Sequence, residues 1–206
     1  HYPYFRSENK RSLRACFPLA PGFGLRWTAQ GLGPRGRCSL PHPVRTLKIM
    51  NRVGIGYDVH QFATNRPMIL GGVTIPHSHG LQGHSDADVL SHAIADALLG
   101  ALGLPDIGYY FPPTDPSIEG ISSLQILQKC RALAEEKDAE IVNIDSTLIA
   151  EAPKILPYRE SMQSTIADAL GLHPALIGIK ATTNERMGFV GRGEGMAAMA
   201  VASVAC

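Results

Sequence analysis

The sequence has few of the features that mark secreted or membrane-spanning proteins. Among its 206 residues only four are cysteines, and none of them has CxxC spacing. Such a low cysteine density favours a reducing compartment over a disulfide-built secreted fold. No apolar run approaches the roughly 20 residues that a membrane-spanning helix needs, so we expect no membrane partner.

Several catalytic signatures are also missing. No convincing Ser/His/Asp or Cys/His arrangement for nucleophilic catalysis stands out. The Gly-rich segment 191–195 meets neither the phosphate-loop spacing nor the dinucleotide-binding spacing. Cys130 falls on the apolar face of an expected helix, and we interpret it as a core residue.

Charge is divided unevenly between two parts of the chain. Residues 1–49 contain nine Lys or Arg and one acid, whereas residues 50–206 contain ten basic and 17 acidic residues. Pro and Gly recur in the first part without apolar periodicity, so it cannot bury enough surface to offset its ordering entropy. We therefore predict a disordered basic extension or leader over residues 1–49. No aromatic interleaving or compact motif accompanies these basic residues, and no nucleic-acid partner is expected.

Two origins for this basic part predict different compartments. If Met50 is the native start, the preceding residues are an upstream extension, and we expect the protein in a bacterial cytoplasm. The Arg content and near absence of acids also fit an organelle transit peptide, although Ser and Thr are sparse. That alternative predicts a plastid protein whose mature N-terminus lies near residue 50.

Residues 50–206 are predicted to form a single catalytic domain in which strands and helices alternate, of the α/β or α+β class. The Gly71-Gly72 dipeptide suits a two-residue turn between two short strands. Period-two and β-branched patterns predict strands at Arg52–Tyr57, Met68–Leu70, Val73–Ile75, Glu140–Ala150, Leu176–Ala181 and Met196–Val204. The last of these segments is rich in Ala and could be helical on propensity alone.

Apolar residues at helical spacing predict three helices in the same domain. The first begins with a capping-box pattern, Ser85-Asp-Ala-Asp88, and Gly171 suits the C-terminal cap of the third. Their expected ranges are Ser85 to about Gly103, about 122–137, and from Pro153 or Pro157 to Leu170.

Asp58 and His60 indicate a metal site, because alternate residues of a strand share one face and both can reach one cation. His92, within the first helix, is the third candidate ligand. A His2Asp set with an open fourth position suits a catalytic zinc better than a structural one. Asp-x-His alone is a weak signal, since an ordinary salt-bridged pair has the same spacing.

Carboxylates flank His92 at i−4 and i+4, so Asp88, His92 and Asp96 form one polar stripe on the helix. One interpretation is that a carboxylate accepts the other N–H of a metal-bound imidazole. The alternative for Asp88 is a helix cap without a chemical task. His84 and Ser85 lie at the expected helix N-terminus, where backbone N–H groups favour an anion such as phosphate. A solvent-exposed His beside a simple cap is the plainer alternative.

A second polar cluster lies in the last third of the chain. Lys180-Ala-Thr-Thr-Asn-Glu-Arg186 is followed by Gly188-Phe-Val-Gly-Arg-Gly-Glu-Gly195. Thr hydroxyls, an acid and glycines after a strand can hold phosphate oxygens and a hard cation. Most Gly-rich segments of this kind are only tight turns, so both interpretations stay open.

Taken together, four ordered motifs resemble those of the 2-C-methyl-D-erythritol 2,4-cyclodiphosphate synthase family. They are Gly54-x-Gly-Tyr-Asp-x-His60, His84-Ser-Asp-x-Asp-x-x-x-His92 leading into Asp96-Ala-Leu-Leu-Gly100, Glu151-Ala-Pro-Lys154, and Lys180-Ala-Thr-Thr-x-Glu185 with Gly191-Arg-Gly-Glu-Gly195. The resemblance covers Asn51 to about Val204, and the ordered set is far more specific than any single motif. It implies an α+β fold with helices on one face of a mixed sheet. It also implies a homotrimer whose sheets face the threefold axis and whose active sites lie between neighbouring subunits.

The resemblance assigns roles to matching positions. Zinc or another divalent transition metal would be held with a second divalent ion, magnesium or manganese. The implied metal ligands are Asp58, His60, His92 and Glu185, and the implied catalytic residues are His84 and Thr183. The implied substrate contacts are Ser85, Asp106, Ile107, Gly108, Phe111, Asp115, Ala150, Pro153, Lys154, Ile155, Leu156, Thr182, Phe189 and Arg192. Within that set, Asp106–Gly108 would meet methylerythritol hydroxyls, Ala150–Leu156 would bind cytidine, and Phe189 and Arg192 would lie near the trimer axis.

The implied substrate is linked to cytidine diphosphate: 4-diphosphocytidyl-2-C-methyl-D-erythritol 2-phosphate. Its 2-phosphate attacks the β-phosphorus and releases CMP, so cations must neutralise two approaching anions. Two alternatives remain open. One is a phosphoesterase that uses the same ligands to activate water, and the other is a non-catalytic trimer that senses metal or an isoprenoid diphosphate.

One residue departs from the family pattern. In Phe111-Pro-Pro-Thr-Asp-Pro116, Pro113 stands where the family commonly has Asp. A contact made by that carboxylate or by its backbone N–H is lost here. We expect altered closure or weaker substrate affinity rather than a lost reaction, because the metal ligands lie elsewhere.

Overall fold

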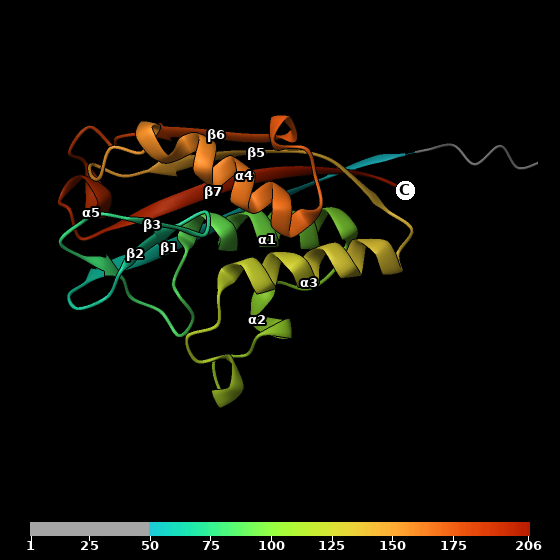
Figure 1. Cartoon of the computed structure of the whole chain (residues 1–206), viewed down its shortest axis with the longest axis horizontal. Helices are drawn as coiled ribbons and strands as arrows, with labels where there is room; N and C mark the ends of the chain where they lie inside the picture. The colour runs from blue at the N-terminus through green and yellow to red at the C-terminus, as the bar shows by residue number, and fades with distance from the viewer. Residues whose placement is uncertain (1–49) are drawn as a thin grey trace, which may run out of the picture. The chain divides into compact units, whose positions relative to one another are not determined.

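A five-stranded mixed sheet organises the described part of the chain (Figure 1). The computed structural model describes residues 50–206, which fall within one compact unit, Thr46–Cys206. The expectations for residues 1–49 lie outside the described residues. The strand order is β4-β1-β7-β5-β6, and β5 and β6 are parallel whereas the other neighbours are antiparallel. The strands are β1 (Asn51–Ala63), β4 (Gly80–Leu81), β5 (Glu140–Ile149), β6 (Ile177–Thr182) and β7 (Gly195–Ala205).

The Ala-rich segment at the chain end forms strand β7 and not a helix. It pairs along its length with β1 on one side and with β5 on the other. Alternate residues of β7 are buried along most of the strand, which gives it one face toward the core. Tertiary pairing therefore overrides the helical propensity of Ala.

The Gly71-Gly72 turn joins β2 (Met68–Leu70) to β3 (Val73–Ile75), so the predicted hairpin is confirmed. Both glycines have positive φ, +55° and +73°. A two-residue turn with positive φ at both central positions matches the right-handed twist of the flanking strands.

Three main helices, α1 (Val89–Leu102), α3 (Ser123–Glu136) and α4 (Arg159–Leu170), lie on one side of the sheet (Figure 1). The predicted range of α3 and the predicted end of α4 at Leu170 are confirmed, whereas α4 begins at Arg159, after a 3₁₀ turn that contains Pro157. The core between helices and sheet is aliphatic and includes Leu90, Ile94, Leu98, Leu127, Ile144, Leu148 and Met162, with Cys130 also buried. None of the helices in the described residues has the length and apolar character required to cross a membrane.

The predicted start of α1 at Ser85 is wrong, because the helix begins four residues later. Ala87 has a φ of +59°, which an α-helix cannot accommodate. Asp88 is the N-cap, and its side chain accepts a hydrogen bond from the Ser91 N–H. The capping box proposed from Ser85 therefore does not form.

Short elements escaped the sequence patterns. They are α2 (Ile107–Tyr110), α5 (Gly188–Gly191) and the 3₁₀ turns Pro116–Ile118, Leu156–Tyr158 and Pro174–Leu176. Segments of three or four residues are too short to establish a helical period. Two of them nevertheless matter below, because α2 lines the cavity beside Asp58, His60 and His92 and α5 follows the second polar cluster.

The sheet face opposite the helices carries apolar side chains that no described element covers. Alternate residues of β1, namely Val53, Ile55, Tyr57 and Val59, are 43–66% exposed. Met199 and Val201 of β7 continue this surface and are each 43% exposed. Contiguous apolar surface of this kind is typical of faces that contact another molecule.

Candidate functional site

Three side chains from β1 and α1 converge at one end of the helix-covered sheet face. The Asp58 Oδ2 atom lies 2.9 Å from His60 Nε2 and 3.0 Å from His92 Nδ1. The two imidazole nitrogens are 3.1 Å apart. Tetrahedral coordination with bonds of about 2.0–2.1 Å would place ligand atoms about 3.3 Å from one another. The donor set and its spacing therefore fit a divalent transition metal.

Strand and helix geometry explain this convergence. Even-numbered residues of β1 face α1, where Gly54 and Gly56 let the two backbones approach closely. Asp58 and His60 continue the same face, and His92 lies in the first turn of α1. Among the described residues, no other group of three or more acidic, His or Cys side chains brings its ligand atoms within 4.8 Å of one another.

Asp58 and His60 perturb each other electrostatically. Burial is the largest single influence and raises the pKa of Asp58, but hydrogen bonds and attraction from His60 and His92 together hold it well below its usual range. Burial lowers the pKa of His60, while the bonds to Asp58 and Gln82 outweigh it and raise the pKa. In the absence of a cation, this pairing gives the site ion-pair character, and metal binding would release a proton.

The outer nitrogen of each imidazole has its own hydrogen-bond partner. His60 Nδ1 lies 2.6 Å from the Gln82 carbonyl oxygen. His92 Nε2 lies 2.9 Å from Ser123 Oγ and 3.2 Å from Ser85 Oγ. These contacts leave His60 Nε2 and His92 Nδ1 directed at Asp58, as ligand nitrogens must be.

The predicted partners of His92 at i−4 and i+4 are wrong. The Asp88 carboxylate accepts from the backbone N–H groups of Gly71 and Gly72, at 2.9 and 2.7 Å, and from Ser91. Burial nevertheless raises the pKa of Asp88. Asp96 Oδ1 accepts from the Ile107 N–H at 2.9 Å. Both carboxylates therefore have structural partners, and the capping alternative for Asp88 holds.

A cavity of about 230 Å³ opens beside the three converging side chains. It brings the predicted residues His84, Ser85, Ile107, Gly108 and Phe111 to the candidate metal ligands. Pro113, Ile118, Ile121 and Ile126 complete its wall. Asp106 caps α2 at its edge, whereas Asp115 caps the exposed turn Pro116–Ile118 and does not line the cavity.

The proposed anion site at the N-terminus of α1 needs correction. His84 lies outside the helix, and the Asp88 carboxylate already occupies the first-turn N–H of Ser91. The His84 segment is instead held by Arg66, whose Nη1 and Nη2 donate to the carbonyls of Gly83 and Ser85 at 2.7 and 2.5 Å. No sequence pattern indicated Arg66, because the bonds it makes are long-range contacts to backbone.

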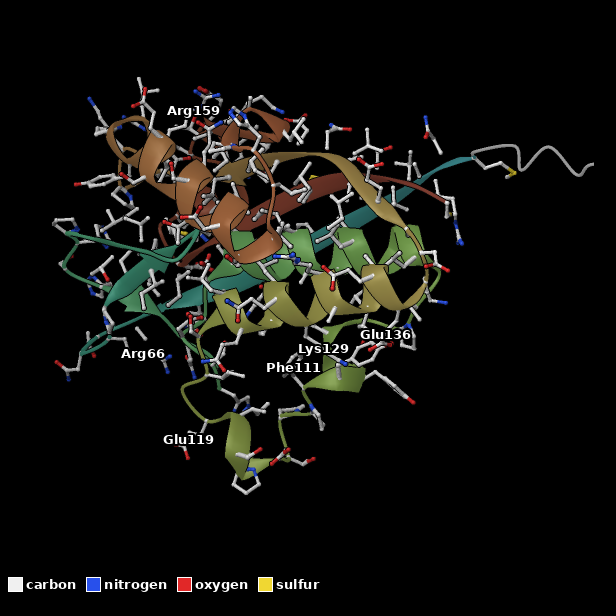
Figure 2. The ribbon with its side chains drawn as sticks, turned by 45° about the vertical axis from the view of Figure 1, so that its right-hand side comes forward. Arg66, Phe111, Glu119, Lys129, Glu136 and Arg159 are labelled. Atoms are coloured by element: carbon white, nitrogen blue, oxygen red, sulfur yellow. The ribbon has the colours of Figure 1, made fainter. Side chains whose placement is uncertain are left out.

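The predicted cytidine-binding segment lies at a different cavity. Ile155 and Leu156 line a space of about 360 Å³ together with Arg159, Ile179, Lys180 and Ala181. Lys154 is exposed, whereas Ala150 is 9% exposed and Pro153 is half-buried. Arg159, which sequence patterns did not indicate, lies on α4 at the top of Figure 2, far from Phe111 below α1 and α3.

The segment that carries Thr183 and Glu185 has a strained backbone. Glu185 and Arg186 both have positive φ, +50° and +62°. Glu151 Oε1 accepts hydrogen bonds from the N–H groups of Asn184 and Arg186, at 3.0 and 3.1 Å, and so stabilises this shape. Thr183 Oγ1 donates to Glu185 Oε1 at 3.0 Å. Strain held by a neighbouring carboxylate is typical of functional segments.

Phe189 and Arg192 lie beyond this segment, at α5 and its end. Arg192 pairs in a two-point contact with Glu194, at 2.6 and 3.2 Å, and the hydrogen bond raises the pKa of Arg192. Thr182 lines a third cavity, on the open sheet face beside Ile55 and Val201.

One chain does not bring its two polar clusters together. Asp58, Ala198, Leu148 and Ala181 form one row across the sheet. Three strand spacings separate its ends, so Asp58 and Ala181 lie about 14 Å apart. Asp58 faces the helices, whereas the neighbouring Thr182 faces the open side. Within one chain, Asp58 and Thr182 are therefore about three strands apart and on opposite faces of the sheet.

Comparison with known proteins gives concordant matches. A family model described as the YgbB family matches residues 51–205. A protein of Akkermansia muciniphila named 2-C-methyl-D-erythritol 2,4-cyclodiphosphate synthase is 62% identical over 152 residues, which cover 73% of this chain and 90% of that protein. The structure described as IspF (Plasmodium falciparum) CDP complex is 32% identical, with a TM-score of 0.66, and the match covers 75% of this chain and 95% of that one. The bifunctional IspDF of Campylobacter jejuni is 40% identical, with a TM-score of 0.71, over 77% of this chain and 43% of that one.

Proposed function

Since the chain belongs to the YgbB family, we propose that it converts 4-diphosphocytidyl-2-C-methyl-D-erythritol 2-phosphate to 2-C-methyl-D-erythritol 2,4-cyclodiphosphate with release of CMP. Its activity is that of a cyclodiphosphate synthase of isoprenoid biosynthesis. The observation that carries the assignment is the convergence of Asp58, His60 and His92 beside a cavity. Residues 50–206 would form the catalytic domain.

The reaction forms a phosphorus–oxygen bond between the 2-phosphate and the β-phosphorus. The bond from the β-phosphorus to the bridging oxygen breaks, and its electron pair leaves with CMP. Two anions must approach, so Asp58, His60 and His92 would hold zinc or another divalent transition metal, which supplies Lewis-acid neutralisation when bound. Glu185 would hold magnesium or manganese together with phosphate oxygens, since one carboxylate often suffices for such an ion.

The remaining residues orient the substrate and exclude water. His84 and Ser85 line the cavity, and their side chains would donate to phosphate oxygens. Ile107, Gly108 and Phe111 form an apolar wall against which the methylerythritol part would pack. Holding both reacting ends can supply about 7–11 kcal/mol by removing orientational freedom. Thr183 would orient the diphosphate from the second cluster.

A homotrimer would complete the active site. The open, apolar sheet face supports packing of three sheets around a threefold axis, because it leaves Ile55, Tyr57 and Val201 without cover in the described chain. The separation of the two polar clusters supports an active site between neighbours. The Ala150–Leu156 and 182–185 segments of one subunit would bind cytidine and diphosphate beside the metal ligands of the next. Phe189 and Arg192 would lie near the axis.

Phosphorus NMR with the cytidylyl substrate tests the activity. We expect signals of the cyclic diphosphate and CMP, and loss of both after treatment with a chelator, with recovery when Zn²⁺ and Mg²⁺ are restored. A linear, hydrolysed phosphate would indicate a phosphoesterase that activates water at the same ligands. Unchanged substrate with metal present would contradict an enzymatic role and favour a sensor.

Pro113→Asp tests the departure from the family pattern. Pro113 lines the cavity, so a carboxylate there would gain a hydrogen bond to a substrate hydroxyl. One such bond is worth about 0.5–1.5 kcal/mol, which predicts a KM lower by about 2- to 10-fold with kcat within about twofold. Pro116→Asp is the control, since Pro116 is exposed and outside the cavity wall. Equal KM values for Pro113→Asp and wild type would mean that this position does not contact substrate.

A further inference from the structure

A buried chain of hydrogen bonds leads from the candidate metal ligand His92 to a carboxylate on another segment. His92 Nε2 lies 2.9 Å from Ser123 Oγ, and Ser123 Oγ in turn contacts Asp86 Oδ1. Ser123 is fully buried and His92 is 6% exposed, so water does not compete at the middle of this chain. Asp86 is part of the second sequence motif, but the resemblance assigned it no role.

The direction of each proton follows from the chemistry of the groups. An ionised carboxylate can only accept a hydrogen bond, so the single proton of the Ser123 hydroxyl must point at Asp86. Ser123 Oγ can then only accept from His92, which requires a proton on Nε2. His92 Nδ1 is thereby left as the nitrogen that can bind metal; it lies 3.0 Å from Asp58 Oδ2, and any proton that it shares with this carboxylate leaves when metal binds.

We propose that Asp86 is a positioning residue that acts through Ser123 to keep the His92 ring in the tautomer and orientation that bind metal. This inference rests on the proposed function, because it assumes that His92 is a ligand. Partners of this kind fix the imidazole and raise its basicity, and their loss costs about 10- to 100-fold in metal affinity. The other ligand differs, since His60 Nδ1 is held by a backbone carbonyl that no side-chain substitution removes.

Ser85 is the competing partner of His92, but it does not reverse the tautomer. Its Oγ lies farther from Nε2, at 3.2 Å, and already accepts the Ala87 N–H at 3.0 Å. Ser123 Oγ lies closer to His92 Nε2 than Ser85 Oγ does. The Ser123 proton points at the charged Asp86 carboxylate, and such charge-assisted hydrogen bonds are stronger than those between neutral groups. Nε2 therefore donates to Ser123.

Asp86 also ties the metal centre to the wall of the cavity. Its second oxygen, Oδ2, accepts the Ser123 N–H at 2.9 Å at the start of α3. Its own N–H donates to the Ile121 carbonyl at 3.0 Å, and the neighbouring His84 carbonyl accepts from Gly120 at 2.8 Å. Ile121 lines the cavity, so the Asp86 carboxylate fixes the imidazole through Ser123, while backbone bonds of His84 and Asp86 hold the segment that would cover the substrate.

Two variants test the hydrogen-bond chain from Asp86 through Ser123 to His92. Asp86→Asn keeps the shape but adds an amide donor, which lets the Ser123 proton turn toward His92 Nε2. Ser123→Ala removes the bridging hydroxyl and leaves the backbone contacts of Asp86 in place. For both we expect the dissociation constant for Zn²⁺, measured by competition with a chromogenic chelator, to rise about 10- to 100-fold. Asp138→Asn is the matched control, because Asp138 is exposed, far along the chain, and has a φ of +51° that Asn tolerates.

The second measurement reads the imidazole directly. Long-range ¹H–¹⁵N NMR of metal-free wild-type protein, with His92 assigned from a His92→Gln variant, should show a proton on Nε2, and Asp86→Asn should raise the population in which Nε2 has no proton. A wild-type His92 without a proton on Nε2 would overturn the proposal. So would wild-type Zn²⁺ affinity in both folded variants. The wild-type reading can overturn the proposal even if neither variant folds, and failure of wild type to bind Zn²⁺ would count separately against the proposed function.

Discussion

Gly56→Ala is expected to lower the free energy of unfolding by about 3 kcal/mol or more, the upper end of what overpacking costs. A Cβ at this position would lie 1.9 Å from the Ala93 carbonyl oxygen and 2.7 Å from the Ala97 N. Both atoms are helix backbone and cannot rotate aside, so β1 and α1 must separate. Asp58 follows two residues later and His92 lies beside Ala93, so the metal-ligand cluster should open as well. Urea unfolding followed by circular dichroism measures the loss.

Gly100→Ala is the matched control on the same strand–helix interface. Its Cβ would lie 3.7 Å from the Gly54 Cα, an ordinary van der Waals distance. Ala is favoured over Gly within a helix by about 0.5–1 kcal/mol, so this variant should be neutral or slightly more stable. If the two variants unfold at the same urea concentration, close approach at Gly56 is not what holds β1 against α1.

Local chemistry accounts for the parts of the fold that sequence patterns predicted. The Gly71-Gly72 turn, the cap at Gly171 and the helix that contains Cys130 depend on residues close together in the chain, so their patterns are visible in the sequence. The start of α1 depends on tertiary contacts instead. Asp88 binds the distant turn at Gly71-Gly72, and this bond selects a later start than the local capping pattern predicts.

The candidate site divides in the same way. The shared face of Asp58 and His60 follows from the period of a strand, and the structure brings His92, the third candidate from the sequence, to them. Their outer partners could not be predicted, because Gln82 and Ser123 lie 22 and 31 residues away from the imidazoles they contact. Contacts between distant segments leave no periodic trace. Sequence patterns therefore predicted the candidate metal ligands and missed the residues that orient their imidazole rings.

The separation of the two polar clusters gives the proposed trimer a quantitative consequence. His92→Ala removes a ligand from the first cluster, and Glu185→Gln removes the carboxylate from the second. Each variant alone should have no measurable cyclisation activity. If an active site combines the first cluster of one subunit with the second cluster of its neighbour, co-expression in equal amounts restores the sites in which both halves happen to be intact. With random assembly into closed rings, half of the subunits have an intact first cluster, and half of their neighbours have an intact second cluster. About one quarter of the sites, and so about one quarter of wild-type activity, should therefore return.

A site built within one chain predicts a different result, because every chain in that mixture carries a defect and no activity should return. The double variant His92→Ala/Glu185→Gln, co-expressed equally with wild type, provides the complementary measurement. Sites shared between neighbours would keep about one quarter of full activity, since both contributing halves must come from wild-type chains, whereas sites within one chain would keep about one half. Mass spectrometry of intact assemblies gives the subunit ratio needed to normalise both results. Recovery of activity in the first mixture together with the lower value in the second is expected only if neighbouring subunits share each active site.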